Sequence, residues 1–400
     1  MKRLADLPFV DLIKSGPFGT SLGAKEYVTA GTPNALALVS VGEIRDGFVE
    51  LSDRTPWVSH STQQRLPIFS LTRSDVIVAR KGNVDRSAWV DSDNRYFLGS
   101  DGILIRCRTA IEARYVAYAL QMPSTRAWLR RHAGGSTLAS LNAQTLSDAP
   151  IPHASIENAQ GTISILTTLD DKIAANRRII NTSATLVDAL AKQIQTISTM
   201  PAFEEIAEIG GGGTPSTKEA TFWNGNISWA TPTDVTASVG PWLTTTTRAI
   251  TDSGLTSCAS PLYPEGSILM TSRATIGEIV LAAGPMAVNQ GFIVVNAKNP
   301  ENQTWLYTAM RARVQEFKDW ANGATFMELS RGTFKKLHVT MPDPESITRF
   351  NAKARPLLKR TLAAQSENEA LSRTRDELLP LLMSGKITIS DAEKTVEEVV

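Results

Sequence analysis

Several groups of residues have the types that enzymes use, but none has the spacing that its chemistry requires. The four glycines at 210–213 are not followed by a Gly-x-Gly-x-x-Gly pattern, and Thr214-Pro215 predicts a turn where a dinucleotide site needs a helix. The Ser-Gly-Lys-Ile run at 384–387 lacks the first glycine and the hydroxyl residue of a phosphate-binding loop. The histidines are scattered without metal-ligand spacing, at His60, His132, His153 and His338.

One acidic cluster has the acid-x-lysine order found in nuclease sites. This cluster, Asp170-Asp171-Lys172, is predicted to lie on the exposed side of a helix, which favours a solvated charge cluster. The sequence also lacks a Gly-x-Ser-x-Gly nucleophile motif, and it lacks the Pro-Pro pair that an amino-methyltransferase loop requires. It therefore predicts a chain that is not itself an enzyme and that holds no metal and no cofactor of its own.

Length and composition constrain the number of domains and the class of protein. At about 100 to 200 residues per domain, 400 residues predict two to four structural units, and 42% hydrophobic content is typical of a globular protein. The net charge of +1 argues against a strongly basic nucleic-acid binder, although residues 1–155 hold 18 basic and 14 acidic residues. Cys107 and Cys258 are too few for a disulfide framework or a zinc site.

Targeting signals are equally sparse. No apolar run approaches the roughly 20 residues of a membrane span, so we expect no membrane insertion. The first six residues, Met-Lys-Arg-Leu-Ala-Asp, carry two cations without an apolar segment after them, which does not predict a secretion signal. We therefore expect a cytoplasmic protein.

The chain repeats itself at an offset of roughly 190 residues. Three segments recur in the same order: 76–82 and 268–274, 99–105 and 288–294, and 133–138 and 321–326. The first pair predicts a buried strand leading into a polar, basic turn, and the second predicts a polar turn entering a strand. Two similar globular halves are therefore expected.

Each half is followed by apolar residues at heptad spacing. In the first segment one column is Leu166, Ile173, Ile180, Val187 and Ile194, and the other is Leu169, Leu190 and Ile197, interrupted by Asn176 and Ser183. In the second segment the column is Phe350, Leu357, Ala364, Leu371 and Leu378, and the weaker companion column contains Asn368 and Arg375.

The heptads predict an antiparallel pair of long helices, because a 3.5-residue repeat keeps one seam facing a partner helix. A helix from 163 to 197 is about 50 Å long at ~1.5 Å per residue. The alternative is that both segments are ordinary core helices of two domains. Within the second segment, Pro356 predicts a kink or a restart.

Local motifs complete the pattern. They read Gly-Pro-Phe-Gly-Thr-Ser-Leu at 16–22, Leu-Asp-Asp-Lys-Ile-Ala-Ala-Asn-Arg-Arg-Ile at 169–179, Gly-Gly-Thr-Pro-Ser at 212–216, Phe-Trp-Asn-Gly-Asn-Ile-Ser-Trp at 222–229 and Glu-Leu-Leu-Pro-Leu-Leu-Met-Ser-Gly at 377–385. With the repeat and the heptads, these motifs closely resemble the specificity (S) subunit of type I restriction-modification systems. The resemblance spans nearly the whole chain.

The resemblance implies an α/β (α+β) fold. Two mixed α/β target-recognition domains in a pseudo-twofold repeat are expected, separated by an antiparallel pair of long coiled-coil helices. The expected boundaries are 1–155 for the first domain, 156–199 for the first spacer helix, 200–342 for the second domain, 343–385 for the second spacer helix and 386–400 for a tail without an assigned function.

The resemblance also implies a function. The chain would be a non-catalytic subunit that reads a two-part DNA target with an unread spacer, and it would dock two adenine-N6 methyltransferase subunits and, through them, nuclease-translocase subunits. S-adenosylmethionine would belong to the methyltransferase, and ATP and magnesium to the nuclease-translocase. Two alternatives stay open: a coiled-coil scaffold with two protein-binding domains, and a hydrolase using the Asp170 region or a histidine.

Candidate DNA contacts follow from the same resemblance, because bases are read by paired donors and acceptors and phosphates by cations or backbone amides. In the first half they are Arg80, Lys81, Arg86, Ser100 and Asp101. In the second half they are Ser272, Arg273, Asn289 and Gln290, with Lys218, Thr231, Thr233 and Asp234 in a stretch similar to the family's Trp-x-x-x-x-Asp loop. Residues shared by both halves, such as Lys81 and Arg273, are expected to hold phosphates or the fold, since the two half-sites normally differ.

Overall fold

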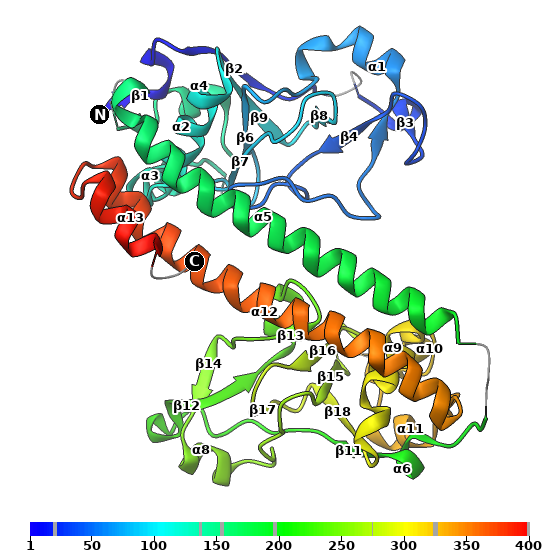
Figure 1. Ribbon diagram of the computed structural model, residues 1–400. Helices are drawn as coiled ribbons and strands as arrows, with labels where there is room; N and C mark the ends of the chain where they lie inside the picture. The colour runs from blue at the N-terminus through cyan, green and yellow to red at the C-terminus, as the bar shows by residue number, and fades with distance from the viewer. Residues whose placement is uncertain are drawn as a thin grey trace. The chain divides into compact units, whose positions relative to one another are not determined.

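The computed structural model describes residues 1–18, 22–135, 138–152, 156–194, 198–273, 275–322 and 327–397. The chain divides into two compact units. The first unit consists of Met1–Asp170 and Ser372–Val400, and the second of Asp171–Leu371. Each unit contains a mixed α/β globular part and a section of both long helices. The predicted fold class is confirmed (Figure 1).

In the first unit, two four-stranded sheets form the globular part. One sheet has the order β2-β9-β6-β7 and the other β3-β5-β4-β8. The strands are β2 (Val10–Ser15), β3 (Tyr27–Val28), β4 (Leu36–Val39), β5 (Trp57–Val58), β6 (Asp75–Ala79), β7 (Ser87–Trp89), β8 (Tyr96–Leu98) and β9 (Gly102–Cys107), with β1 (Lys2–Arg3) paired to β10 (Pro150–Ile151). The helices of this globular part are α1 (His60–Arg65), α2 (Ala110–Gln121), α3 (Pro123–His132) and α4 (Ala143–Ser147).

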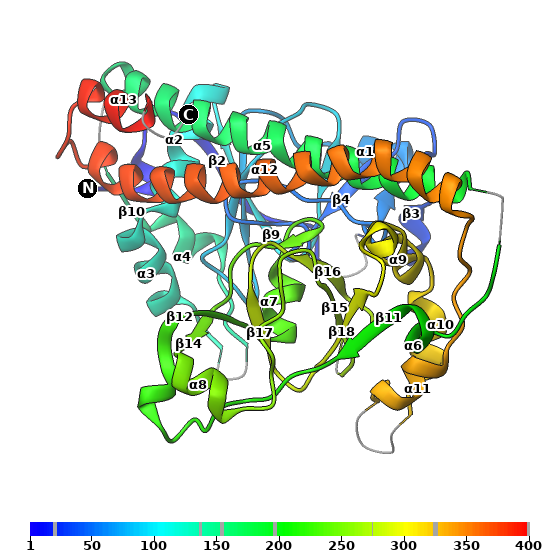
Figure 2. The ribbon, with the colours of Figure 1, turned by 60° about the horizontal axis from the view of Figure 1, so that its bottom comes forward.

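The second unit has a five-stranded sheet, β11-β18-β15-β16-β13, and a three-stranded sheet, β14-β12-β17. Figure 2 shows β14, β12 and β17 close together in the second unit. The strands are β11 (Ala207–Gly210), β12 (Trp223–Ala230), β13 (Trp242–Leu243), β14 (Arg248–Ile250), β15 (Ile268–Thr271), β16 (Ile279–Ala282), β17 (Met286–Val288) and β18 (Phe292–Ala297). The helices are α6 (Phe203–Ile206), α7 (Pro232–Ala237), α8 (Asp252–Ser257), α9 (Gln303–Ala312), α10 (Val314–Asp319) and α11 (Arg331–Lys336).

The internal repeat is present in the pairing of the strands. In each half a central strand, β9 or β18, lies antiparallel between two others. In each half the other sheet contains a parallel pair, β4 with β8 or β12 with β17. The sequence alignment of the second repeated segment is one residue out of register. Ala79 pairs with Gly102 and Thr271 with Phe292, so Gly102 corresponds to Phe292 and not to Gly291.

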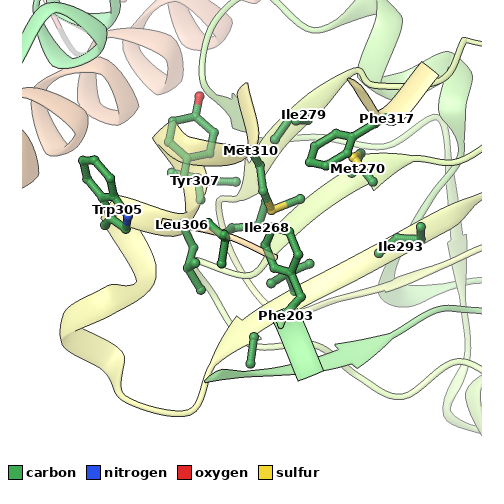
Figure 3. Packing of buried hydrophobic residues seen from close by; sticks show 14 of the residues in the cluster. Phe203, Ile268, Met270, Ile279, Ile293, Trp305, Leu306, Tyr307, Met310 and Phe317 are labelled. Carbon is green, nitrogen blue, oxygen red and sulfur yellow. The ribbon is translucent and has the colours of Figure 1, made fainter. Parts of the chain in front are cut away.

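The cores explain why these segments become strands. Val76, Ile77 and Val78 of β6 are completely buried, as expected for a strand covered on both faces. In the second unit Ile268, Met270 and Ile293 from β15 and β18 pack with Phe203 and with α9 and α10 (Figure 3). Buried apolar surface of this extent supplies most of the favourable free energy of folding.

The two long helices are α5 (Ile156–Lys192) and α12 (Pro344–Met383), and they run side by side in opposite directions (Figures 1 and 2). The predicted antiparallel pair is confirmed. With 37 residues, α5 is about 55 Å long at ~1.5 Å per residue. The helix continues through Pro356, so a restart there is wrong.

A further helix follows in the predicted tail. This helix, α13 (Ile389–Glu397), buries Ala392, and a β-carbon at Gly161 of α5 would collide with the Ile389 side chain. The missing side chain at Gly161 therefore leaves room for the Ile389 side chain of α13 against α5. Among the described residues, no helix is long and apolar enough to cross a membrane.

Candidate nucleic-acid interface

Most of the heptad residues are buried, and several of them pack in the core of the second unit. On α5, Leu166, Leu169, Ile173, Ile180 and Val187 are buried and Leu190 is partly buried. Ile194 follows the end of α5 and is also partly buried. On α12, Phe350, Ala364, Leu371 and Leu378 are buried and Leu357 is partly buried. Ile197 lies outside the described residues.

Two polar residues of the heptad columns, Asn176 and Arg375, have partners on the opposite helix. In the second unit, Asn176 is buried, and its side-chain amide donates a hydrogen bond of 2.6 Å to the Glu367 carboxylate, which also pairs with Lys172 at 3.1 Å. Although burial opposes it, the hydrogen bonds from Asn176 and Lys172 hold the pKa of Glu367 below its ordinary value. One polar pair in an apolar seam favours a single register, because any shift leaves the buried amide without its partner.

Asp170 is a structural residue and not part of a solvated cluster. Its carboxylate accepts hydrogen bonds from the Arg375 guanidinium of α12 and from the Tyr118 hydroxyl of α2, both at 2.8 Å. Although burial opposes it, the charge of Asp170 raises the pKa of Arg375, and the guanidinium stays charged. The solvated-cluster interpretation was wrong because Arg375, 205 residues away, brings its charge into the seam.

In the first half, the predicted contacts gather on two neighbouring turns. The Arg80 guanidinium lies 4.2 Å from the ring centre of Phe18 and donates to the Ser100 carbonyl oxygen. Lys81 forms an ion pair of 2.9 Å with Asp101, and their side chains are 45% and 34% exposed. Ser100 is exposed, and Arg86 is half-buried on the turn between β6 and β7. Arg80, Lys81, Ser100 and Asp101 therefore share one surface.

In the second half, Arg273 holds the position of Lys81. Each of the two residues forms an isolated antiparallel β-bridge, Lys81 with Ser140 and Arg273 with Glu328. Arg273 also forms an ion pair of 2.9 Å with the Glu328 carboxylate. Ser272 is only 2% exposed, and its backbone groups bond to Gly291 and Leu329, so it supports the turn from inside.

Asn289 and Gln290 lie on the turn before β18. The Asn289 side chain accepts a hydrogen bond of 2.8 Å from the Gly291 N–H, which shapes the turn. Gln290 is exposed and accepts a hydrogen bond of 2.6 Å from the Thr214 hydroxyl. Gln290 therefore lies beside the glycine segment that opens the second half.

The glycines that open the two halves are required by the same kind of close contact with a neighbouring backbone. A β-carbon at Gly16 would collide with the Gly99 carbonyl oxygen, and one at Gly212 would collide with the Val288 carbonyl oxygen. Only glycine allows the chain to approach these backbones so closely. Of the first motif, residues 19–21 lie outside the described residues.

Asp234 organises the loop that contains Thr231 and Thr233. Its buried carboxylate accepts hydrogen bonds from the backbone N–H and hydroxyl of both Thr231 and Thr247, at 2.6 to 2.8 Å. Although burial opposes it, these hydrogen bonds hold the pKa of Asp234 below its ordinary value of 3.8. Thr233 and Lys218 are exposed.

Replacing Asp234 by alanine is expected to lower the free energy of unfolding by about 1–3 kcal/mol, because buried donors lose their acceptor. A lowered pKa stabilises the folded state above the ordinary pKa, and this contribution disappears as the pH falls through the folded-state pKa. The difference between wild type and Asp234→Ala in urea unfolding should therefore be constant from pH 7 to 5 and shrink below about pH 4. The control is Thr233→Ala, and a difference that persists unchanged at pH 3 would contradict the assignment.

One arginine near this loop was missed by sequence reasoning. Arg248 of β14 lies over the Trp223 ring, 3.3 Å from its centre, and next to Trp229 at 5.6 Å. The tryptophans were visible in the sequence, but the arginine comes to them through the pairing of β12 with β14. No signal of local spacing pointed to this contact.

The arrangement offers binding chemistry, with cations, amides and hydroxyls on exposed turns. Among the described residues, no group of three His, Cys, Asp or Glu side chains could hold a metal ion. Lys81 and Arg273 each form an ion pair with a carboxylate, which keeps the local net charge of the surface near zero.

Comparison with known proteins finds a family match over the second half of the chain. Residues 201–349 match the family described as type I restriction modification DNA specificity domain. A type I restriction enzyme MjaIX specificity subunit from Methanocaldococcus jannaschii is 35% identical over 144 residues, which cover 36% of this chain and 33% of the relative. A HindI specificity subunit from Haemophilus influenzae is 27% identical over 191 residues, which cover 47% of this chain and 41% of the relative. The matched segments thus span less than half of these relatives.

A solved structure extends the likeness to the fold of the whole chain. The type I restriction-modification S subunit from M. genitalium superposes with a TM-score of 0.58 and 16% identity, covering 95% of both chains. The fold, with its two α/β units and paired long helices, is therefore shared. Residues 201–349 therefore match the type I restriction modification DNA specificity domain, and the chain as a whole shares the fold of the solved S subunit.

Proposed function

We propose that this chain is the DNA-recognition subunit of a type I restriction-modification complex and performs no catalysis itself. The observation that carries the proposal is the DNA specificity domain at 201–349, in a chain whose first half repeats the same strand pairings. One recognition domain at 1–155 and another at 200–342 would each read one half of a two-part target. Two linked domains bind more tightly than either alone, because the second binds at a high effective concentration.

The cations shared by the halves suit phosphate contacts. Lys81 and Arg273 occupy equivalent positions, and each is about half exposed beside one carboxylate. An ion pair that is this exposed contributes only about 0–1 kcal/mol, so a DNA phosphate can replace the carboxylate at little cost. Phosphate contacts position a protein on DNA without reading sequence, which fits residues common to two domains with different targets.

The helix pair would hold the two domains and dock the partners. About 55 Å of helix compares with ~34 Å for one turn of B-DNA, which leaves an unread spacer between two half-sites. Two adenine-N6 methyltransferase subunits would bind here and would bring S-adenosylmethionine, and nuclease-translocase subunits would bring ATP and magnesium. In this proposal the chain works in the cytoplasm, where its DNA and its partners are.

Arg273→Ala is expected to weaken DNA binding of the assembled methyltransferase complex by a similar factor for every sequence, because a phosphate contact carries no base information. The slope of log K against log salt should become less steep by about 1. Lys81→Ala should behave in the same way. The control is Glu265→Ala, an exposed change in the same unit. An unchanged salt slope would contradict the phosphate role.

The proposed function is tested by co-expressing the chain with a methyltransferase subunit in a host without adenine methylation, followed by sequencing that detects N6-methyladenine. The expected result is methylation at a two-part motif with a gap of fixed length. A complex that assembles and methylates without a two-part motif would contradict the proposal, and so would one that binds DNA no better than the methyltransferase alone.

A further inference from the structure

Arg248 is held in one orientation by two tryptophans. It lies on β14 directly opposite Trp229 of β12, and its guanidinium lies 3.3 Å from the ring centre of Trp223. A guanidinium at this distance from an aromatic face is attracted by the ring quadrupole and stacks on it. The side chain is exposed, yet it is ordered before any ligand arrives.

The two tryptophans are themselves fixed. Their rings meet edge to face, with centres 5.1 Å apart and an interplanar angle of 86°. The Trp223 indole N–H donates to the Ser216 carbonyl oxygen at 3.1 Å, and that of Trp229 to the Gly213 carbonyl oxygen at 3.0 Å. Because both rings are buried and hydrogen-bonded, they form a rigid support for the arginine.

The hydrogen-bonding edge of Arg248 stays available. Stacking uses the face of the guanidinium and leaves its in-plane N–H donors directed outward. Within the part of the chain that the structure describes, Arg248 takes part in no ion pair within 4.0 Å, unlike Lys81 and Arg273, which have Asp101 and Glu328. An ordered arginine with unused donors is suited to a bidentate acceptor.

Arg248 also lies among the predicted DNA contacts. The preceding residue, Thr247, binds the Asp234 carboxylate, which in turn holds Thr231. On the other side, Trp229 binds Gly213, whose neighbour Thr214 binds Gln290. These contacts place the guanidinium on the same part of the second unit as Thr231 and Gln290.

At the strand position equivalent to Arg248, the first half has a proline. Val39 of β4 and Ala230 of β12 occupy equivalent positions. The Val39 carbonyl oxygen accepts a hydrogen bond from the N–H of Gly99, which directly follows β8, and the Ala230 carbonyl oxygen accepts one from the N–H of Asn289, which directly follows β17. Leu38 therefore corresponds to Trp229, and the residue across from Leu38 is Pro56, whose carbonyl accepts from the Leu38 N–H. Proline stands where the second half has Arg248, so this feature distinguishes the two halves.

We infer that Arg248 reads a guanine in the half of the target that the second domain recognises. A residue that selects bases must differ between two domains with different targets, whereas shared cations cannot select. Arginine recognises guanine by donating two hydrogen bonds to O6 and N7 in the major groove, a pattern that no other base presents. This inference rests on the proposed function and names the residue and the base through which the second domain selects its half-site.

The test uses Arg248→Met and Arg248→Lys in the full chain, assembled with its methyltransferase subunits. Methionine keeps an apolar contact with the tryptophans and removes the donors, while lysine keeps the charge and loses the planar pair of donors. The control is Lys318→Met, which removes an exposed cation of α10 in the same unit. Binding is measured on the wild-type target and on oligonucleotides with each base pair of both half-sites replaced in turn.

Arg248→Met is expected to weaken binding to the wild-type target about five- to a hundredfold and to abolish discrimination at one G·C pair in one half-site. Discrimination at every other position, including the whole other half-site, should be unchanged, and Arg248→Lys should lose the same discrimination in part. Equal weakening on all oligonucleotides would overturn the inference, since that is the result of a purely structural role. Failure of the wild-type complex to prefer any two-part sequence would instead overturn the proposed function.

Discussion

Trp242→Ala is expected to lower the free energy of unfolding by about 3–5 kcal/mol, which is the usual cost of truncating a buried tryptophan. The Trp242 side chain is 8% exposed and packs in the main core of the second unit. Its indole N–H donates to the Leu358 carbonyl oxygen at 3.0 Å and to the Thr361 hydroxyl at 3.1 Å, both on α12. Urea unfolding of the purified chain measures the loss.

The backbone of the same residue makes a second attachment that the variant keeps. The Trp242 N–H donates to the Gln365 side-chain oxygen, and the Gln365 amide donates back to the Trp242 carbonyl. The matched control is Trp320→Ala, because Trp320 is 50% exposed in the same unit and its truncation should cost less than about 1 kcal/mol. Equal losses for the two tryptophans would contradict the assignment of Trp242 as the anchor between β13 and α12.

Asp170→Ala is expected to lower the free energy of unfolding by about 2–4 kcal/mol, because it leaves the buried Arg375 charge without its main partner. The Arg375 side chain is only 11% exposed, and Tyr118 loses a hydrogen-bond acceptor at the same time. The loss falls below that of a fully buried pair, since the Asp170 side chain is 26% exposed and Arg375 keeps a contact with Asp376. Thermal and urea unfolding measure this loss in the free energy of unfolding.

Asp170→Asn separates the charge from the hydrogen bonds. Asparagine can still accept from Tyr118 but does not neutralise Arg375, so an intermediate loss is expected. The control is Glu377→Ala on the exposed face of α12, which should change stability by less than about 0.5 kcal/mol. If Asp170→Ala is as mild as this control, Asp170 is a solvated residue after all and the seam does not depend on it.

Patterns that repeat along the chain predicted the architecture. Period-seven apolar residues such as Ile173 and Ile180 indicated the helix pair, and the recurrence of buried runs at 76–79 and 268–271 indicated two similar sheets. These signals are local or periodic, so they are visible without a structure. The one-residue error in the alignment at Gly102 arose because glycine and polar turn residues tolerate a shift that only strand pairing resolves.

Polar contacts between distant segments were not predictable. Asp170 contacts Arg375, 205 residues away, and Trp242 contacts Gln365, 123 residues away. The sequence next to either residue of a pair does not indicate which distant residue it will contact. The same holds for Arg248, which reaches Trp223 only because β14 pairs with β12. Such pairs depend on the tertiary fold and not on local sequence.

The position of the candidate site could be predicted from the sequence, but the roles of several of its residues could not. The turns that hold Lys81 and Arg273 were found because they follow buried strands, and both side chains lie on the surface. Ser272 and Asp234 were chosen for their hydrogen-bonding groups, but the fold uses these groups internally. Sequence alone does not distinguish a polar side chain that faces a ligand from one that holds a loop.

The central claim is that each half of this chain reads its own half of a divided DNA target. The most direct test replaces residues 200–342 by the corresponding domain of a specificity subunit with a known target and maps N6-methyladenine after co-expression with the same methyltransferase. The account predicts that one half of the motif changes to that of the donor, while the other half and the spacer length stay the same. A motif that changes in both halves, or in neither, would contradict it.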